Sequence, residues 1–313
     1  MYNYSYFSNR VLCFRGFNCI DMILSSLGVI SVNRGMSYIA PLDVYTGASM
    51  AYSLRKLRTL YTGSAISVRR SNDNISADIG FSSSGQLDTT ALLNHCGANS
   101  GYVTKWYDQS GNGVNIVQTT YANQPMIVNA GSLVTSSGSV CIQFDGVDDH
   151  LTVLNSVFSG TNKPISTYQV LEYSTLRYNE TLTISRESSP SACEFIIPFR
   201  SYDNTSYGLS WRDSGCTIKS NLFGTPTINK QLLTQWSNGT TTSNNKNGTN
   251  LVSNFNISVG NIVINNITIG ALKRNSISGY SHMKSMEVII YPTNESSNIS
   301  AMESNINSFY SIY

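Results

Sequence analysis

Short apolar or alternating runs dominate the chain after residue 100, each bounded by Gly, Asn, Asp or Ser clusters that favour turns. Runs of this length at regular spacing are typical of a β-sandwich or barrel. Alternation also predicts earlier strands near 65–70 and 79–81. The later runs predict strands at 102–107, 140–144, 151–154, 165–173, 181–184, 195–199, 207–211, 257–269 and 286–291. The Asn/Thr/Gly/Ser tract 237–250 is expected to form an exposed loop or hairpin.

A different period, of three to four residues, indicates helices at three places. Apolar residues at Met50, Leu54, Leu57 and Leu60 predict a helix over 48–60. A shorter helix is expected over 87–93, with Asp88 placed to cap its start. A C-terminal helix is expected within 295–313, where one side would carry Ile299, Met302, Ile306, Phe309 and Tyr310.

The 313 residues divide most naturally into residues 1–40, an N-terminal arm or anchor, and residues 41–313, one β-sandwich domain. Residues 1–40 contain no proline and match nothing that follows. Their apolar stretch 20–32 is too short to span a bilayer and has the length of a signal-peptide core. It lacks a small-residue cleavage site, so we favour an arm or an early strand and keep a signal peptide as the alternative.

Charged residues make up only 12% of the chain, against 41% hydrophobic and 11% aromatic residues. Hydroxyl and amide groups therefore provide most of the surface polarity. Such a composition suits an extracellular or particle-surface protein that hydrogen-bonds to sugars or to copies of itself. A net charge of +2 argues against nucleic-acid binding through phosphate neutralisation.

The six cysteines lie far apart and show no metal-ligand spacing, which excludes a structural zinc site. We expect buried free thiols, with disulfides as the alternative, because a chain of this length does not need cross-links to fold. The cysteines are Cys13, Cys19, Cys96, Cys141, Cys193 and Cys216.

Several stretches resemble the concanavalin-A-like (laminin-G-like) jelly-roll modules of phage and other viral structural proteins. They are AYSLRKL at 51–57, WYDQSGNG at 106–113, FDGVDD at 144–149, EVIIY at 287–291 and NINSFY at 305–310. The resemblance spans residues 41–313. It implies an all-β, concanavalin-A-like jelly-roll β-sandwich, to which the patterns above add a short helix after the arm and a C-terminal helix.

The YDQSGNG stretch is also similar to one in the catalytic domain of fungal α-L-arabinofuranosidase B, a retaining glycosidase on the same fold. In that family, the nucleophile is a Glu just before an Asn-Asn-Leu-Phe run, and the acid/base is an Asp just after an Ile-Gly-Gly run. The matching positions here are Lys219 and Leu272, so both carboxylates are missing. The resemblance thus predicts the fold without catalysis, unless a shifted alignment brings in Asp213 or Glu287.

Two groups of residues are candidates for binding a sugar. Asp108, Gln109 and Asn112 lie in a Gly-rich loop that could present polar groups to a sugar; the alternative is a turn that satisfies its own backbone. Trp211 and Trp236 lie beside polar loops and could stack on sugar rings, although most aromatic residues of a sandwich fill its core.

Asp145, Asp148 and Asp149 place three carboxylates in five residues, a spacing that could hold calcium. The alternative is a hairpin turn stabilised by Asp side chains. We expect no other cofactor. The basic residues at 55–58 and 69–70 are expected to lie on a solvated surface.

These observations favour a non-enzymatic virion surface protein, such as a spike, a fibre or a capsid-associated subunit. The sandwich would bind a host surface glycan, the arm would contact other virion proteins, and the chain would form a homo-oligomer, with a trimer as the first guess. The expected location is the virion surface or the extracellular space, with neither a nucleic-acid partner nor a membrane span. The alternatives are a secreted glycosidase of arabinofuranosidase type and a purely architectural capsid or decoration protein.

Overall fold

The computed structural model describes residues 11–12, 20–24, 30–33, 40–187 and 193–313. The chain divides into two compact units, Met1–Ala40 and Pro41–Tyr313. In the first unit, β1 (Val11–Leu12), β2 (Ile20–Leu24) and β3 (Ile30–Asn33) form a small antiparallel sheet in that order. The apolar stretch 20–32 therefore contains strands, in agreement with the expectation of an arm or an early strand.

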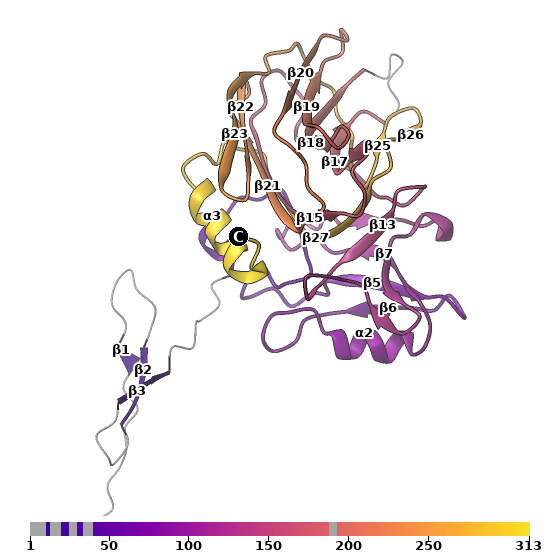
Figure 1. Ribbon diagram of the computed structural model, residues 1–313, viewed down its shortest axis with the longest axis vertical. Helices are drawn as coiled ribbons and strands as arrows, with labels where there is room; N and C mark the ends of the chain where they lie inside the picture. The colour runs from indigo at the N-terminus through magenta and orange to yellow at the C-terminus, as the bar shows by residue number, and fades with distance from the viewer. Residues whose placement is uncertain (1–10, 13–19, 25–29, 34–39, 188–192) are drawn as a thin grey trace, which may run out of the picture. The chain divides into compact units, whose positions relative to one another are not determined.

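The second unit is all-β, with antiparallel pairing throughout its main sheet and few helices, which confirms the predicted fold class (Figure 1). Its helices are α1 (Pro41–Val44), α2 (Thr89–Cys96), the 3-10 turn η1 (Tyr121–Asn123) and α3 (Ile299–Tyr310). Among the described residues, no helix is long and apolar enough to cross a membrane. The strands are β4 (Met50–Ser53), β5 (Ile66–Arg70), β6 (Ser76–Ile79), β7 (Gly101–Trp106), β8 (Ile116–Val117), β9 (Met126–Asn129), β10 (Ser132–Leu133), β11 (Thr135–Ser136), β12 (Ser139–Val140), β13 (Ile142–Asp145), β14 (Leu151–Leu154), β15 (Ile165–Tyr173), β16 (Asn179–Glu180), β17 (Leu182–Ser185), β18 (Phe195–Ser201), β19 (Tyr207–Arg212), β20 (Ile218–Phe223), β21 (Gln231–Ser237), β22 (Thr241–Lys246), β23 (Thr249–Asn256), β24 (Asn266–Ile269), β25 (Leu272–Lys273), β26 (Ile277–Ser278) and β27 (His282–Tyr291).

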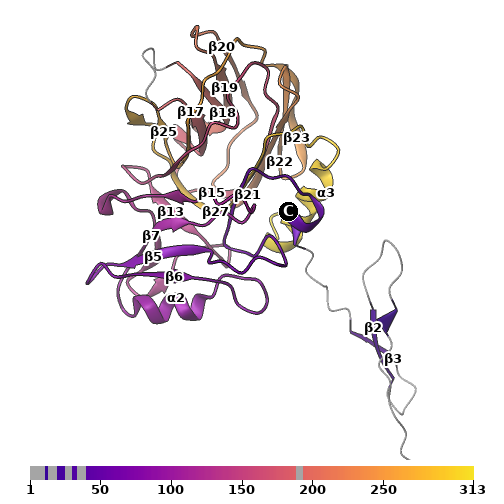
Figure 2. The same ribbon diagram turned by 180° about the vertical axis from the view of Figure 1, so that it is seen from behind.

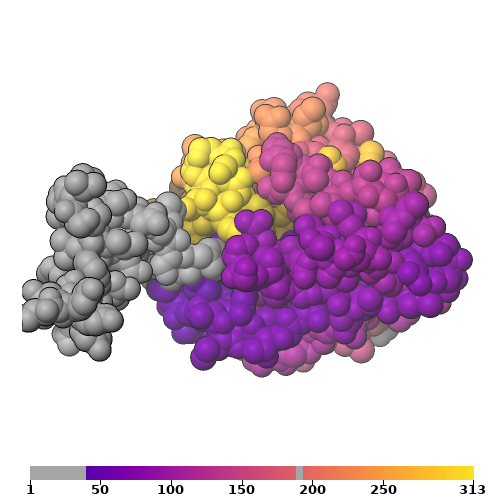
Figure 3. All heavy atoms as spheres, turned by 90° about the horizontal axis from the view of Figure 1, so that it is seen from below, coloured from indigo at the N-terminus to yellow at the C-terminus, as the bar shows by residue number. Residues whose placement is uncertain are grey.

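Strands β15 and β27 form the centre of the sheet, and side chains are buried on both of their faces. β15 pairs with β21 on one side and β27 on the other, and β27 continues to β4 and β13. Leu171 and Tyr173 of β15 point into the main core, whereas Tyr168 and Val170 belong to a second apolar cluster that α3 covers. The predicted C-terminal helix is thus confirmed, and Figure 3 shows it in yellow on the surface of this unit.

The predicted helix over 48–60 is wrong, because this segment contains strand β4 instead. Met50 and Tyr52 lie in the main core, whereas Ala51 lies in the cluster under α3. A strand buried on both faces is almost continuously apolar, and some of its positions match a helical spacing by coincidence. Leu60, the last member of the presumed helical face, is 90% exposed. The short helix that follows residue 40 is α1, upstream of the predicted one.

The predicted helix near 87–93 forms as α2. Asp88 accepts a hydrogen bond from the Ala91 backbone N–H at 2.9 Å, which satisfies one donor of the first helical turn. The helix continues to Cys96 and ends at Gly97, which has a positive φ of 57°. The capping role predicted for Asp88 is confirmed.

The polar tract 237–250 forms hairpins between β21, β22 and β23, as predicted, but it is exposed only near its turns, at 238, 240 and 248–250. Positions 242–245 of β22 are buried. Asn244 Nδ2 donates to the Pro198 carbonyl at 3.0 Å, and Asn245 Nδ2 donates to Glu303 Oε1 at 3.1 Å. Such hydrogen bonds compensate the cost of burying an amide, so a tract without apolar residues can still lie inside the protein.

The basic residues after β4 are not all solvated. Arg55 is fully buried and forms a bidentate pair with Glu287, with Nε–Oε2 at 2.6 Å and Nη2–Oε1 at 2.8 Å. Arg70, by contrast, pairs with Asp73 at 2.6 Å on the surface, as expected. Arg55 and Glu287 therefore connect β4, β27 and the C-terminal helix in the interior.

The expectation of free thiols is confirmed for Cys96 and Cys141, which are buried and reduced, and wrong for Cys193 and Cys216, which form a disulfide. Cys193 precedes β18 and Cys216 follows β19, and these strands pair antiparallel, so the fold brings the two ends together. Cys13 and Cys19 lie outside the described residues.

Candidate functional site

The carboxylate of Asp108 is occupied by the backbone around it. Oδ1 accepts hydrogen bonds from Ala51 N and Ser110 N, each at 2.9 Å. Oδ2 accepts from Ser110 Oγ at 2.7 Å and Val114 N at 3.1 Å. The bonds to Ser110 and Val114 lie within the loop, as expected for a turn that satisfies its own backbone, and the bond to Ala51 fixes β4 against the loop.

Gln109 and Asn112 also contact the segment around β4. The fully buried Gln109 accepts from Leu57 N at 2.7 Å and donates to the Ser53 carbonyl at 3.0 Å. Asn112 Nδ2 donates to the carbonyls of Ala48 and Ser49 at 3.1 and 3.0 Å.

The two candidate tryptophans lie in other parts of the second unit. Trp211 is 2% exposed in the main core, and Trp236 packs against the cluster under α3. The five candidate sugar-binding residues are therefore not brought together in one site, and sugar binding by them stays a prediction.

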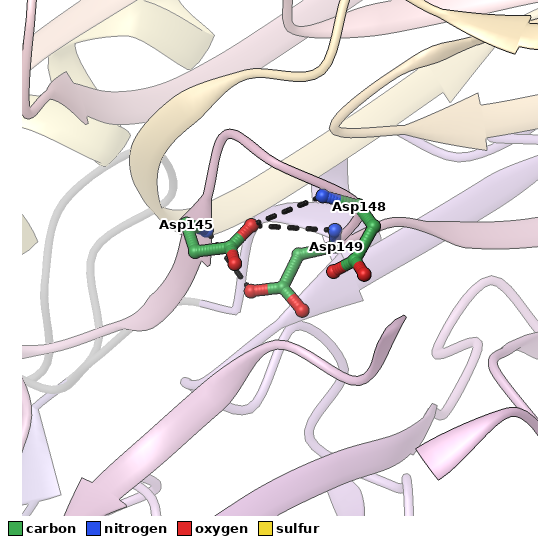
Figure 4. A group of neighbouring side chains, drawn as sticks. All are labelled: Asp145, Asp148 and Asp149. Carbon is green, nitrogen blue, oxygen red and sulfur yellow. Dashed lines mark hydrogen bonds between the residues drawn. The ribbon is translucent and has the colours of Figure 1, made fainter. Parts of the chain in front are cut away.

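Asp145, Asp148 and Asp149, the aspartate turn, do come together, with one carboxylate oxygen of each within 4.8 Å of the others (Figure 4). Asp145 Oδ1 accepts from the backbone N–H groups of Val147, Asp148 and Asp149 at 2.8, 3.3 and 3.4 Å. Asp149 Oδ2 accepts from Asp145 N at 2.9 Å. These bonds are those of a side-chain-stabilised hairpin turn, and calcium binding stays a prediction.

Burial and, to a smaller extent, the nearby carboxylates of Asp145 and Asp148 together raise the pKa of Asp149 to about 7, although the hydrogen bond from the Asp145 backbone N–H offsets part of the rise. A carboxyl group with this pKa is partly protonated near neutral pH. The turn therefore holds less negative charge than three ionised aspartates would.

A second cluster of charged groups surrounds Glu180, which is buried in β16 opposite Arg200 of β18. Arg200 Nη2 lies 3.5 Å from Glu180 Oε1, and Arg200 Nη1 donates to the Tyr178 hydroxyl. Gly279, at a positive φ of 63°, lets the loop after β26 approach closely, since a Cβ there would lie 2.6 Å from Glu180 Cγ. We call Tyr178, Glu180, Arg200 and Arg274 the Glu180 site.

The electrostatics of the Glu180 site favour a proton on the carboxyl group. Burial raises the pKa of Glu180, and Arg200, Tyr178 and Arg274 offset only part of that effect. Neither carboxylate oxygen makes a hydrogen bond of good geometry. A buried carboxyl group with a raised pKa is suited to donate a proton.

Exposed aromatic rings lie beside the buried Glu180. Tyr178 and Tyr202 are 41% and 46% exposed, and their ring centroids lie 5.7 Å apart in an edge-to-face arrangement. Arg200 Cζ lies 5.2 Å from the Tyr178 ring centroid. An exposed aromatic pair beside a buried acid resembles a surface for a sugar ring more closely than the separated tryptophans do.

Arg177 connects the Glu180 site to the aspartate turn. Its Nη2 donates to the Gly146 carbonyl in that turn and lies 3.5 Å from the Tyr280 carbonyl. Asp148 also helps to raise the pKa of Tyr280, after burial. The two acidic groups thus flank the same short segment, Gly279–Tyr280.

The positions that the arabinofuranosidase B resemblance assigns to catalysis do not form a pair. Lys219 is the cross-strand partner of Trp211 and shares its face, which is that of the main core. Leu272 packs with Phe195, the cross-strand partner of Arg212, on the other face. On that face, β20 carries the non-acidic residues Ile218, Ser220 and Leu222.

Asp213 and Glu287, which a shifted alignment could place at the catalytic positions, both make contacts that hold the surrounding structure together. Asp213 accepts from Thr217 N at 2.8 Å and Gly260 N at 2.5 Å. Glu287 is held by Arg55. Among the acids near the Leu272 side of the sandwich, Glu187 pairs with Lys273 and Glu194 with Arg186, whereas Glu180 interacts electrostatically with Arg274, two residues after Leu272.

Glu180 was not identified as a candidate site residue from the sequence, and only one feature of the sequence could have indicated it. Glu180 directly precedes a predicted strand in a chain that is poor in charge, and a Glu at a buried position almost always has a partner. The partners Arg200 and Arg274 could not be identified without the fold.

A cavity of about 230 Å³ lies elsewhere in the second unit. It is lined by Leu54, Gln86, Leu87, Thr89, Gly138, Ser139, Val140, Phe309 and Tyr310. None of these residues carries a carboxyl group or a histidine ring, so the cavity offers no acid–base chemistry.

Comparison with known proteins relates this unit to glycosidases. Residues 41–163 match the family model "Alpha-L-arabinofuranosidase B, catalytic". No curated protein matches the chain significantly. A GH54 α-L-arabinofuranosidase soaked with a cyclic sulfate inhibitor superposes with a TM-score of 0.66 at 14% identity, over 86% of this chain and 65% of that one. An arabinofuranosidase complexed with arabinofuranosyl-α-1,2-xylobiose gives a TM-score of 0.61 at 15% identity, over 86% and 64%.

These findings correct two expectations. The match to a catalytic-domain family favours the glycosidase alternative over the non-enzymatic virion surface protein, and it also overturns the expectation that the chain is not an enzyme. The likeness to viral structural modules stays a prediction. The chain spans about two thirds of the arabinofuranosidases it superposes on, and its sandwich is distantly related to the arabinofuranosidase B catalytic domain.

Proposed function

We propose that this protein is a glycoside hydrolase of arabinofuranosidase type that acts on arabinose-containing polysaccharide. The observation that carries the proposal is the match of residues 41–163 to the arabinofuranosidase B catalytic family, within a sandwich that superposes on two such enzymes. The Cys193–Cys216 disulfide supports a location outside the cytosol, where such a polysaccharide would be met.

Glu180 is the proposed proton donor. Glycosidic bond cleavage needs a carboxylic acid that protonates the leaving oxygen, and the raised pKa of Glu180 keeps it protonated closer to neutral pH. Once the proton has left, the guanidinium of Arg200 at 3.5 Å stabilises the carboxylate. The exposed rings of Tyr178 and Tyr202 would hold the sugar above this group.

Asp148 is the proposed second carboxyl group. Glycosidases use a second carboxylate either to attack the sugar or to activate water. The side chain of Asp148 is more exposed than that of Asp149. Asp148 also interacts electrostatically with Tyr280, the neighbour of Gly279, which packs closely against Glu180. In this proposal, an acid from β16 and an acid from the aspartate turn replace the family's missing carboxylates.

The test is the release of arabinose from arabinofuranosyl-substituted xylo-oligosaccharides by the full chain and its variants. Glu180→Gln and Asp148→Asn should each lower kcat/KM by about 100-fold or more, because each removes one acid–base group. Asp73→Asn, which changes a surface acid of the same type that is paired with Arg70, should leave the rate unchanged.

Saccharide binding without any release by the wild-type protein would overturn hydrolysis. Full activity in Glu180→Gln would remove Glu180 from the mechanism. Circular dichroism and the urea midpoint of each variant show whether a lost rate reflects lost folding.

A further inference from the structure

We propose that the cavity of about 230 Å³ beside α3, the α3 cavity, binds one neutral sugar unit of a glycan. None of its lining residues belongs to the Glu180 site. In both ribbon views α2, whose first residue Thr89 lines the cavity, lies at the lower end of the second unit, whereas β18, which carries Arg200, lies in the upper part (Figures 1 and 2). The inference therefore goes beyond the proposed function and does not depend on it.

Three segments that are far apart in the sequence form most of the cavity wall. They lie within 86–89 at the start of α2, 138–140 in the β11–β12 hairpin and 309–310 at the end of α3. Lys230 ties the last two together, since its Nζ donates to Ser139 Oγ at 3.1 Å and to the Tyr310 carbonyl at 2.6 Å. The Tyr310 hydroxyl donates to Glu287 Oε2 at 3.2 Å. The cavity is thus a preformed part of the fold, as most small-molecule sites are.

The polar side chains of the lining are neutral and have hydrogen-bonding capacity left. Within the part of the chain that the structure describes, the Gln86 amide and the Thr89 hydroxyl have no hydrogen-bond partner. Ser139 Oγ accepts from Lys230, and its own O–H is left to donate. No lining side chain carries a charge. A ligand with several hydroxyl groups can use these donors and acceptors, whereas an ion meets no opposite charge in the lining.

The apolar part of the lining suits the carbon-bound face of a sugar ring. Phe309 is half-buried, and Arg55 Cζ lies 4.9 Å from its ring centroid on the protein side. Leu54 and Leu87, both 5% exposed, add aliphatic surface. An aromatic ring together with a few convergent polar groups is a common lining for a small-molecule site.

The size and the rim of the cavity favour the end of a glycan over its middle. Sites for drug-sized ligands occupy about 300–1,000 Å³, so a volume of about 230 Å³ suits one ring. Gln86 and Gly138 are exposed, which leaves the rim open to solvent on their side. A terminal sugar unit can therefore occupy the cavity while the rest of its chain stays outside.

NMR titrations with saturation transfer to D-xylose, L-arabinose and D-glucuronate test the inference. The two neutral sugars should bind the full chain with dissociation constants of roughly 1–10 mM, as expected for one ring. D-Glucuronate should bind at least about 5-fold more weakly, because no charged lining side chain compensates its buried carboxylate.

The double variant Gln86→Ala/Thr89→Val should bind the neutral sugars about 10-fold more weakly, because it removes two hydrogen-bonding side chains from the wall. Thr90→Val is the matched control. It removes the exposed hydroxyl of the next residue, which does not line the cavity, and should leave the affinity unchanged. Gln86→Ala alone changes an exposed side chain and should weaken binding about 3-fold, so the test survives if the double variant unfolds.

The outcomes separate this inference from the proposed function. Unchanged affinity in the folded variants at Gln86 and Thr89, or tighter binding of D-glucuronate than of the neutral sugars, overturns it. Loss of binding in Tyr178→Ala/Tyr202→Ala would assign the sugar to the Glu180 site and also overturns it. Sugar binding that depends on Gln86 and Thr89 supports the inference whether or not the protein releases arabinose.

Discussion

At the scale of single residues, the aspartate turn makes stability depend on pH. The folded protein raises the pKa of Asp149 to about 7, whereas an Asp in an unfolded chain titrates near 4. Between these values, the folded state binds more protons than the unfolded state does. The free energy of unfolding from this group therefore falls as pH rises from about 4 to 7 and is constant above that range.

Asp149→Asn should remove this dependence, because the amide is uncharged and its oxygen can still accept from Asp145 N. We expect the variant to gain roughly 1–3 kcal/mol over the wild type at pH 8 and to differ little at about pH 4, where the group is largely protonated in the folded protein and the stability difference has not yet developed. Urea unfolding at both pH values measures the difference.

Calcium separates the two interpretations of the turn. If the three carboxylates bind the ion, millimolar calcium should raise the wild-type urea midpoint at pH 8 and leave that of Asp149→Asn unchanged.

An equal pH dependence in wild type and variant would show that Asp149 does not titrate as described.

At the scale of elements, a helix or strand was predictable from its sequence pattern where only one of its faces is buried. α3 buries one side on the cluster shared with β15 and β27, so its apolar residues recur at helical spacing and the helix was predictable. β4 is buried on both faces, and its pattern carries no period that distinguishes strand from helix. Asp88 was interpretable because capping depends on local chain geometry alone.

Ile306→Ala tests the contribution of α3. The side chain is fully buried in the cluster under the helix, so its truncation should lower the free energy of unfolding by about 2–5 kcal/mol. Ser308→Ala, on the exposed side of the same helix, should change it by less than about 0.5 kcal/mol. Urea unfolding of both variants measures the contrast, and similar effects would mean that α3 does not depend on this face for its stability.

At the scale of the whole molecule, the chain consists of two units, and the match to a catalytic family begins at residue 41, where the second unit begins. The described apolar clusters all lie within the second unit. This unit therefore has its own core.

Residues 41–313 alone should fold with the urea midpoint of the full chain's main transition and keep its rate of arabinose release, since Glu180 and Asp148 both belong to this part. The comparison requires only the truncated and full-length proteins under one set of conditions. Insoluble or unfolded truncated protein would show that residues 1–40 contribute to the core of the second unit.

The site was less predictable than the fold. The aspartate turn was predictable because its hydrogen bonds are made within a few residues. The Asp108 loop was visible only as polar residues beside glycines, because its contacts with the segment around β4 join distant parts of the chain. Glu180 was not visible, because its properties come from Arg200 on another strand and from Arg274 and Gly279 near β26.

The all-β class, the capped helix α2, the C-terminal helix and the clustering of three aspartates were predictable from the sequence, since each follows from local periodicity or local hydrogen bonding. Contacts between distant parts of the chain, by contrast, make β4 a strand, bury Arg55 and the polar side chains of β22, and pair Cys193 with Cys216. The physical reason is that burial and pairing depend on which strands lie opposite each other, and antiparallel partners such as β15 and β27 come from distant parts of the chain.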